Sequence, residues 1–200
     1  MNDVANHVWW LASRASGVVA LLLVTVSVGL GLTMSAKLMR RRGLGPKLLA
    51  IHEQTALAGL IALVIHGVTL LGDPWLHPSI AGISVPFTMS YRSFYTGLGI
   101  IGGWLAAVLG LTYYVRRRIG AALWRKAHRA TVVVYLLGVI HTLGAGTDAG
   151  TSWLRWFMVV TGVPIVVLFL RRLLGGRSAA PQARSRVAAR PPMAVWEESA

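Results

Sequence analysis

Two stretches of the sequence decide the fold: residues 48–71, LLAIHEQTALAGLIALVIHGVTLL, and residues 127–144, AHRATVVVYLLGVIHTLG. Each is mostly apolar over about the 20 residues that a helix needs to cross the hydrocarbon core of a bilayer. Each also holds one histidine toward each of its ends: His52 and His66 in the first, His128 and His141 in the second. Because ionisable side chains at membrane depth are costly, they usually mark a functional site.

The composition and the apolar segments indicate an all-α membrane protein. The 200 residues are 55% hydrophobic and only 13% charged. The absence of cysteine excludes a disulfide framework and cysteine-held iron–sulfur clusters. We predict a bundle of five membrane-spanning helices at residues 16–36, 48–71, 94–115, 127–144 and 152–170. Residues 1–174 would form one membrane domain, and residues 175–200, rich in Ala, Arg and Pro, a disordered basic tail.

The basic residues predict the orientation of the bundle. Of the 20 Lys and Arg residues, 17 lie on one side of the predicted membrane, against Arg14, Arg92 and Arg155 on the other. By the positive-inside rule the N-terminus is outside and the C-terminus is cytoplasmic. The basic residues that give the net charge of +14 lie beside the apolar segments, so we expect the lipid bilayer, and not nucleic acid, as the partner. The expected location is the plasma membrane, as in the inner membrane of a bacterium.

Helix geometry predicts which histidines meet. Fourteen residues rise about 21 Å and end about 40° short of four turns, so His52 and His66 project from nearly one face. One helix lies between the two stretches, so both run in the same direction through the membrane. Depth then pairs His52 with His128 near the cytoplasm, and His66 with His141 near the outside. Thirteen residues leave His128 and His141 about 140° apart on an ideal helix, so we expect some distortion there.

Two histidine pairs at two depths predict two haems. Unpartnered polar clusters are unfavourable inside a membrane, and four imidazoles would supply both axial ligands of two haem irons. Iron with both axial positions filled has no site for substrate, so its task is electron transfer and no catalytic residue is predicted. The haem propionates need cations. The candidates are Arg14 and Arg92 near the outer pair and Arg129 near the inner pair. The positive-inside rule explains the position of Arg129 equally well.

Several motifs resemble a known family. They are His52-Glu53 with His66, Val85-Pro86-Phe87 ahead of Ser90-Tyr91-Arg92, WRKAHR at 124–129, and His141 followed by AGTD at 145–148. Over roughly residues 14–172 they look like the ferric reductase-like transmembrane domain, the haem-bearing core shared with NADPH oxidases and ferric reductases. The resemblance implies two b-type haems on His52, His66, His128 and His141, with electrons passing from the cytoplasmic to the outer side. Glu53 stands where bacterial relatives often have a basic residue.

We therefore expect an oxidoreductase, a membrane b-type cytochrome that relays electrons outward and needs a separate donor. Larger family members continue into a flavin and nicotinamide domain, whereas this sequence has no recognisable flavin site. The expected donor is a cytoplasmic flavoprotein reductase or a quinol, and the acceptor a ferric chelate, oxygen or a soluble reductase. An alternative is the haem subunit that serves periplasmic methionine sulfoxide reductase. The pattern of four histidines does not distinguish this subunit from a ferric reductase-like protein. A haem-free metal or proton transporter is disfavoured, because only Glu53 adds a carboxylate to the spans.

Overall fold

The computed structural model describes residues 2–36, 38 and 43–175. Regular structure in this part of the chain is helical, with no strand among the described residues. Apart from Gly175, the predicted tail lies outside the described residues, and so do Lys37 and the arginines at 40–42 of the first basic loop.

Five stretches of helix are long and apolar enough to cross a membrane, which confirms the predicted number. The helices are α1 (Asn2–Ser35), α2 (Leu44–Leu70), α3 (Ile80–Ser84), α4 (Ser93–Ile119), α5 (Ala121–His128), α6 (Thr131–Ala145) and α7 (Ser152–Gly175), with a 3-10 turn η1 (Thr147–Gly150) before α7. The short helices α5 and α6 together make the fourth span, and α3 is too short to be one.

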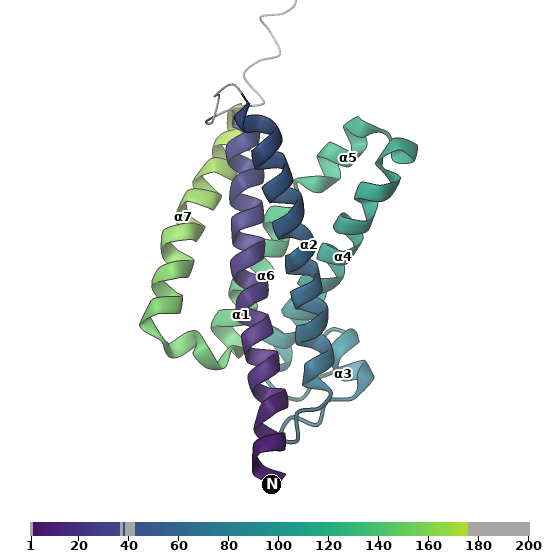
Figure 1. The fold of residues 1–200 in the computed structure, drawn as a ribbon, viewed down its shortest axis with the longest axis vertical. Coiled ribbons are helices and arrows are strands. Elements are labelled where there is room, and N and C mark those ends of the chain that lie inside the picture. Colours follow the sequence, from purple (N-terminus) through teal and green to yellow (C-terminus); the bar gives the residue numbers. More distant parts are fainter. Residues whose placement is uncertain (1, 37, 39–42, 176–200) are drawn as a thin grey trace, which may run out of the picture.

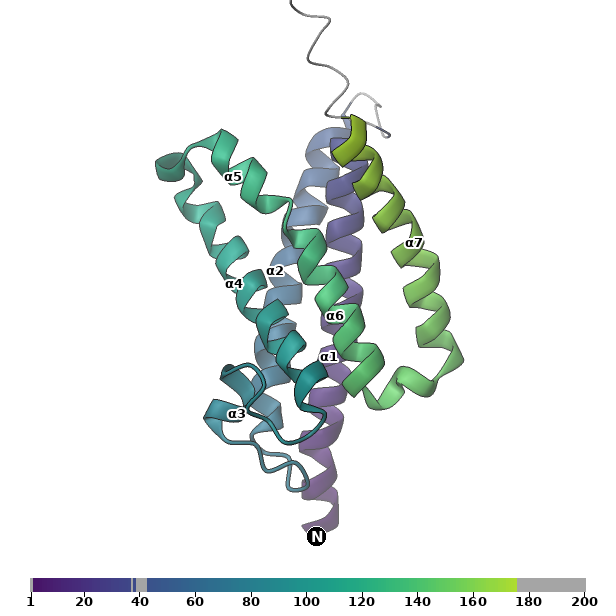
Figure 2. The same cartoon turned by 180° about the vertical axis from the view of Figure 1, so that it is seen from behind.

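Antiparallel α1 and α2 form the centre of the bundle, with α6 behind them in Figure 1. Helices α4 and α5 lie on one side and α7 on the other, as the view from behind also shows (Figure 2). The N-terminus and α3 lie at one end, which we call the α3 end. The opposite end, which we call the basic end, carries five basic residues around the junction of α4 and α5: Arg116, Arg117, Arg118, Arg125 and Lys126.

Two predicted boundaries were wrong. Helix α1 begins at Asn2, well ahead of the apolar segment predicted at 16–36. The segment predicted as one helix at 127–144 is broken, because α5 ends at His128 and a turn at Arg129 and Ala130 precedes α6. The apolar pattern locates a span, but it does not report where polar residues prolong a helix or where the chain bends.

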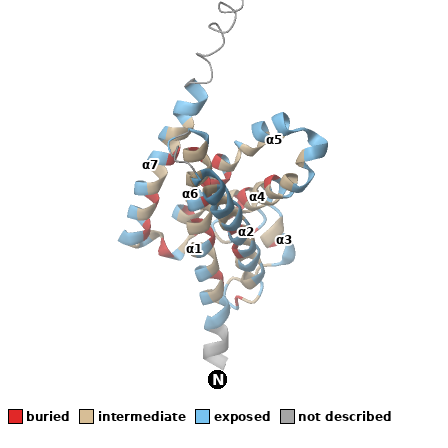
Figure 3. Ribbon diagram, turned by 45° about the horizontal axis from the view of Figure 1, so that its top comes forward, coloured by how far each residue is buried: buried red, intermediate tan, exposed pale blue. Residues whose placement is uncertain are grey.

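The core lies where α1 meets α6 and α7. Val28 of α1, Tyr135 of α6 and Ile165 of α7 belong to one buried cluster, and Leu21 packs with Leu154 and Met158 in a second. Much of the remaining helix surface is exposed, as the pale blue ribbon in Figure 3 shows, and many of the exposed side chains are large and apolar. In a bilayer those faces contact lipid, so no further protein surface is needed to cover them.

Candidate functional site

The structure brings the four histidines together in two pairs. The ring centres of His52 on α2 and His128 on α5 lie 6.0 Å apart, with the ring planes at 89°. Those of His66 on α2 and His141 on α6 lie 6.2 Å apart, at 71°. The first pair is at the basic end and the second toward the α3 end. Each histidine therefore meets the partner that matching by depth predicts.

The break in the fourth span explains how His128 and His141 both reach α2. On an unbroken ideal helix the two side chains would project about 140° apart. His128 is the last residue of α5, and α6 starts at Thr131 after the turn. Helix α5 leans away from the axis of α6 in Figure 2. His128 and His141 therefore belong to two helices with different axes, and both face α2.

Helix α1 supplies hydrogen-bond partners for both histidines of α2. His66 Nδ1 lies 2.8 Å from the backbone oxygen of Ser13, and His52 Nδ1 lies 2.9 Å from that of Ser27. Both serines are buried, and their hydroxyls lie within 3.2 Å and 3.1 Å of the same nitrogens. A carbonyl oxygen only accepts, so each Nδ1 carries the proton and donates it. Each Nε2 then has a lone pair available for a metal.

The remaining two histidines are held differently. His141 Nδ1 donates to the backbone oxygen of Tyr95 on α4 at 3.0 Å. His128 Nδ1 is buried without a hydrogen-bond partner among the described residues. Its ring instead stacks on Trp124, with centres 4.9 Å apart and planes at 22°. Three imidazoles are thus oriented by a backbone carbonyl and the fourth by an aromatic ring.

Glycines face three of the rings. A Cβ at Gly17 on α1 would lie 2.9 Å from His66 Nδ1, and one at Gly99 on α4 would lie 2.5 Å from His141 Nδ1. At Gly31 the nearest atom would be His52 Cε1, at 3.4 Å. Side chains at Gly17 and Gly99 would therefore displace the histidine they face.

The sequence carries a repeat that matches this arrangement and that the sequence analysis missed. The pattern Ser-x-x-x-Gly occurs at 13–17 and again at 27–31, fourteen residues apart. His52 and His66 are also fourteen residues apart. Because α1 and α2 are antiparallel, the first copy faces His66 and the second faces His52. The pattern also occurs at 93–97, so the shared spacing of fourteen residues, and not the pattern alone, is the signal that could have placed α1 beside α2.

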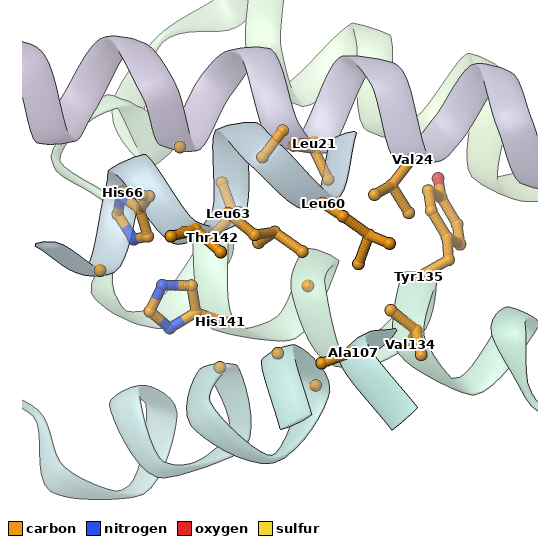
Figure 4. Close-up of a pocket in the computed structure, with 18 of the residues that line it drawn as sticks. Leu21, Val24, Leu60, Leu63, His66, Ala107, Val134, Tyr135, His141 and Thr142 are labelled. Carbon is orange, nitrogen blue, oxygen red and sulfur yellow. The ribbon is translucent and has the colours of Figure 1, made fainter. Parts of the chain in front are cut away.

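One cavity of about 1280 Å³ reaches both histidine pairs. Its volume exceeds the roughly 300–1,000 Å³ typical of a site for one small molecule. Figure 4 shows His66 and His141 facing each other near one end, with Leu63, Leu60 and Val134 continuing the wall. Within the described residues, no group of three or more His, Asp or Glu side chains is placed to hold a bare metal ion. Most of the residues that line the cavity are apolar.

Of the three arginines predicted to contact propionates, only Arg14 lines the cavity. Its guanidinium forms a two-point ion pair with buried Asp148, a partner that the sequence analysis did not assign, and lies 4.9 Å from the Trp10 ring centre. Arg92 precedes α4 in a left-handed conformation and donates to the backbone oxygen of Gly144. Arg129 is exposed in the turn between α5 and α6.

A polar cluster that the sequence analysis also missed lies at the basic end. Tyr113 on α4 donates its hydroxyl hydrogen to Glu53 Oε1 at 2.9 Å. The Arg116 guanidinium lies 3.8 Å from the centre of the Tyr113 ring. Tyr113 and Trp124 are in edge contact, with ring centres 6.2 Å apart. Because Trp124 stacks on His128, the cluster is connected to the histidine pair at this end.

Comparison with protein families agrees with the membrane-spanning helices. Residues 16–139 match the family described as Ferric reductase like transmembrane component. Neither the curated proteins nor the solved structures give a match. The matched range contains His52, His66 and His128 and ends two residues before His141. Since the match covers more than half of the chain, this protein belongs to the ferric reductase-like transmembrane family.

Proposed function

We propose that this protein is a membrane b-type cytochrome that holds two haems and passes electrons across the bilayer. The observation that carries the proposal is the arrangement of His52 with His128 and His66 with His141, at two depths along one cavity. The family is one of membrane electron-transfer components, which supports an oxidoreductase.

The imidazoles fit the donor set of haem iron. Two imidazoles on opposite sides of one metal would have ring centres about 6 Å apart, because the metal–nitrogen bond is about 2 Å and the nitrogen lies about 1 Å from its ring centre. The separations of 6.0 and 6.2 Å agree with this value. The Nδ1 bonds of His52, His66 and His141 fix the tautomer and raise the basicity of Nε2, as metal-binding histidines require.

The residues of the chain would then orient the cofactor and insulate it. Haem iron would supply a one-electron redox couple, and the four histidines are the residues that would hold it. Apolar residues such as Leu60, Leu63 and Val134 keep water away from the centre of the cavity. Arg14 lines the α3 end of the cavity as part of its ion pair with Asp148, while Arg92 and Arg129 remain candidates for charge balance outside the cavity wall.

The charge distribution supports outward electron flow. By the positive-inside rule the basic end faces the cytoplasm of a plasma membrane, here proposed to be a bacterial inner membrane. Moving an electron out of a negative interior is favoured by about 2.3 kcal/mol per 100 mV for a full crossing. Electrons would enter at His52 and His128 from a flavoprotein reductase or a quinol. They would leave near His66 and His141 to a ferric chelate, oxygen or a soluble reductase such as the methionine sulfoxide enzyme.

A haem-free transporter has less support. Transport of a cation through the bundle would need further ligands or proton carriers between the pairs. The carboxylates whose side chains the structure describes are Glu53, Asp73 and Asp148, and Asp148 is neutralised by Arg14. Apolar side chains line the cavity between the two pairs.

Single histidine replacements test the assignment of the two haems. We expect His66→Ala and His141→Ala to lose the same haem, and His52→Ala and His128→Ala to lose the other, because about 20 Å along α2 separates the two sites. Redox titration of each variant, followed by visible absorption, identifies the remaining haem. Loss of the same haem in His52→Ala and His141→Ala would contradict the pairing.

A further inference from the structure

We propose that a small cavity at the α3 end binds a primary ammonium group, with the Asp73 carboxylate as its acceptor. This small cavity has a volume of about 360 Å³ and is lined by His7, Trp10, Asp73, Pro74 and Trp75. It adjoins the large cavity, whose wall also includes Trp10, Asp73 and Trp75. None of the four paired histidines lines it, and the inference does not depend on bound haem.

The first observation is an unsatisfied oxygen on Asp73, a side chain that is only 2% exposed. Asp73 Oδ1 accepts the backbone N–H groups of Trp75 and Leu76, at 2.9 and 3.1 Å. Asp73 Oδ2 is buried and has no hydrogen-bond partner among the described residues. A buried acceptor without a donor is unfavourable, and more so when it carries charge. A ligand that donates a hydrogen bond to Oδ2 would therefore bind favourably.

The turn after α2 holds this carboxylate in place. The Asp73 N–H donates to the backbone oxygen of Leu70, and the Asp73 backbone oxygen accepts the N–H of His77, both at 3.1 Å. With Oδ1 also bonded to the backbone, a rotation of the side chain would break existing hydrogen bonds. The free oxygen is thus preorganised, so a ligand would lose little binding energy in ordering it.

The second observation concerns charge. Arg14 lies beside the same cavity wall, with its guanidinium 4.9 Å from the Trp10 ring centre, but it forms its ion pair with Asp148. No ion pair within the described part of the chain includes Asp73. The charge of the Asp73 carboxylate is therefore available to a cation from outside the chain.

The third observation is the pair of indole rings in the wall. Trp10 of α1 packs so closely on the turn that a Cβ at Gly72 would overlap its ring. Trp75 is 75% exposed, so the wall that it forms lies at the surface of the molecule. Indole rings attract a cation that lies within about 6 Å of the ring centre. The cavity thus combines one free carboxylate oxygen with aromatic walls.

This combination favours a primary ammonium group over other cations. Calcium takes six to eight oxygen ligands, whereas Asp73 offers one free oxygen. A guanidinium group binds best to both oxygens of a carboxylate, and Oδ1 is already in use. A quaternary ammonium group has no N–H donor and would leave Oδ2 without a partner. A primary ammonium group is a compact charge with three donors.

A primary ammonium group at this level comes either from a lipid headgroup or from a soluble amine. Tryptophan side chains gather where a bilayer meets water, which is also where the headgroups lie. The headgroup of phosphatidylethanolamine ends in a primary ammonium group. A soluble amine would present the same group to Asp73, so the experiment has one arm for each source.

The test is the binding of ethylammonium to the full chain in nanodiscs of phosphatidylcholine, measured by saturation-transfer NMR titration. We expect saturable binding that is about 10- to 100-fold weaker in Asp73→Asn, because that variant loses a charge-assisted hydrogen bond. Asparagine keeps an oxygen for the N–H groups of Trp75 and Leu76, and an unchanged circular dichroism spectrum verifies the fold. Tetramethylammonium, which has no N–H donor, should bind at least about 10-fold more weakly than ethylammonium.

Two tryptophan variants test the aromatic wall. Trp75→Leu should weaken ethylammonium binding by about 2- to 5-fold, as expected for the loss of an exposed cation–π contact. Trp156→Leu is the matched control, because it removes an indole that is 67% exposed on α7 and does not line the small cavity. That variant should keep the parental affinity.

Nanodiscs that contain phosphatidylethanolamine separate the two sources. Loss of ethylammonium binding in them identifies the lipid headgroup as the occupant, and unchanged binding identifies a soluble amine; either result supports the site. Equal affinity of the parental protein and Asp73→Asn for ethylammonium overturns the inference. So does tetramethylammonium binding as tight as that of ethylammonium, or the absence of saturable binding in phosphatidylcholine nanodiscs.

Discussion

At the scale of single residues, the site is built from contacts that orient imidazole rings. The backbone oxygens of Ser13, Ser27 and Tyr95 each receive an Nδ1 proton from a different histidine. Small residues beside the rings matter equally, because any side chain at Gly17 or Gly99 would occupy the space of a histidine. Gly17 and Gly99 therefore leave the space that the rings of His66 and His141 occupy.

Two glycines of α4 give a sharp test of this account. Gly99→Ala puts a Cβ 2.5 Å from His141 Nδ1, whereas Gly103→Ala meets nothing within 4 Å. We expect Gly99→Ala to lose most of the haem at the His66–His141 pair, so that about half of the haem absorbance remains, since altered outer-shell contacts cost about 10- to 100-fold in affinity. Gly103→Ala should retain full absorbance. Equal absorbance in the two variants would show that Gly99 has no part in placing His141.

At the scale of elements, the spans were predictable and their details were not. Length and hydropathy predict five spans because a bilayer demands about 20 apolar residues in succession. The break at Arg129 and Ala130 contains no glycine or proline from which the sequence could predict it. The pairing of histidines needed only helix rise and direction. By contrast, Arg14 and Asp148 are 134 residues apart, and the sequence analysis had no rule that joined them.

Helix α5 makes the histidine pair at the basic end depend on an aromatic ring. His128 has no described partner for Nδ1, so its orientation relies on stacking with Trp124. We expect Trp124→Ala to release haem from the His52–His128 site about 10- to 100-fold faster, as loss of an outer-shell partner does, while the other haem stays bound. Transfer of haem to apomyoglobin measures both rates.

The control for this prediction is Trp156→Ala, which removes an indole that is 67% exposed on α7. That variant should release both haems at the parental rates. If Trp124→Ala instead released the haem of the His66–His141 site, the assignment of Trp124 to the basic end would be wrong.

At the scale of the whole molecule, one apolar cavity connects two histidine pairs that lie toward opposite ends of a membrane bundle. Family membership and five spans agree with a component of membrane electron transfer. The distribution of charge adds a direction, because the basic end is the one that the positive-inside rule assigns to the cytoplasm. In the proposed function the electron donor acts at the basic end and the acceptor at the α3 end.

The central claim is that the four histidines hold two haems. The most direct measurement is the pyridine haemochrome assay on protein produced with ample haem supply, combined with an accurate protein concentration. The account predicts two haems of type b for each chain, with a low-spin absorption spectrum typical of iron with two imidazole ligands. A chain that folds into the membrane and carries no haem would contradict it.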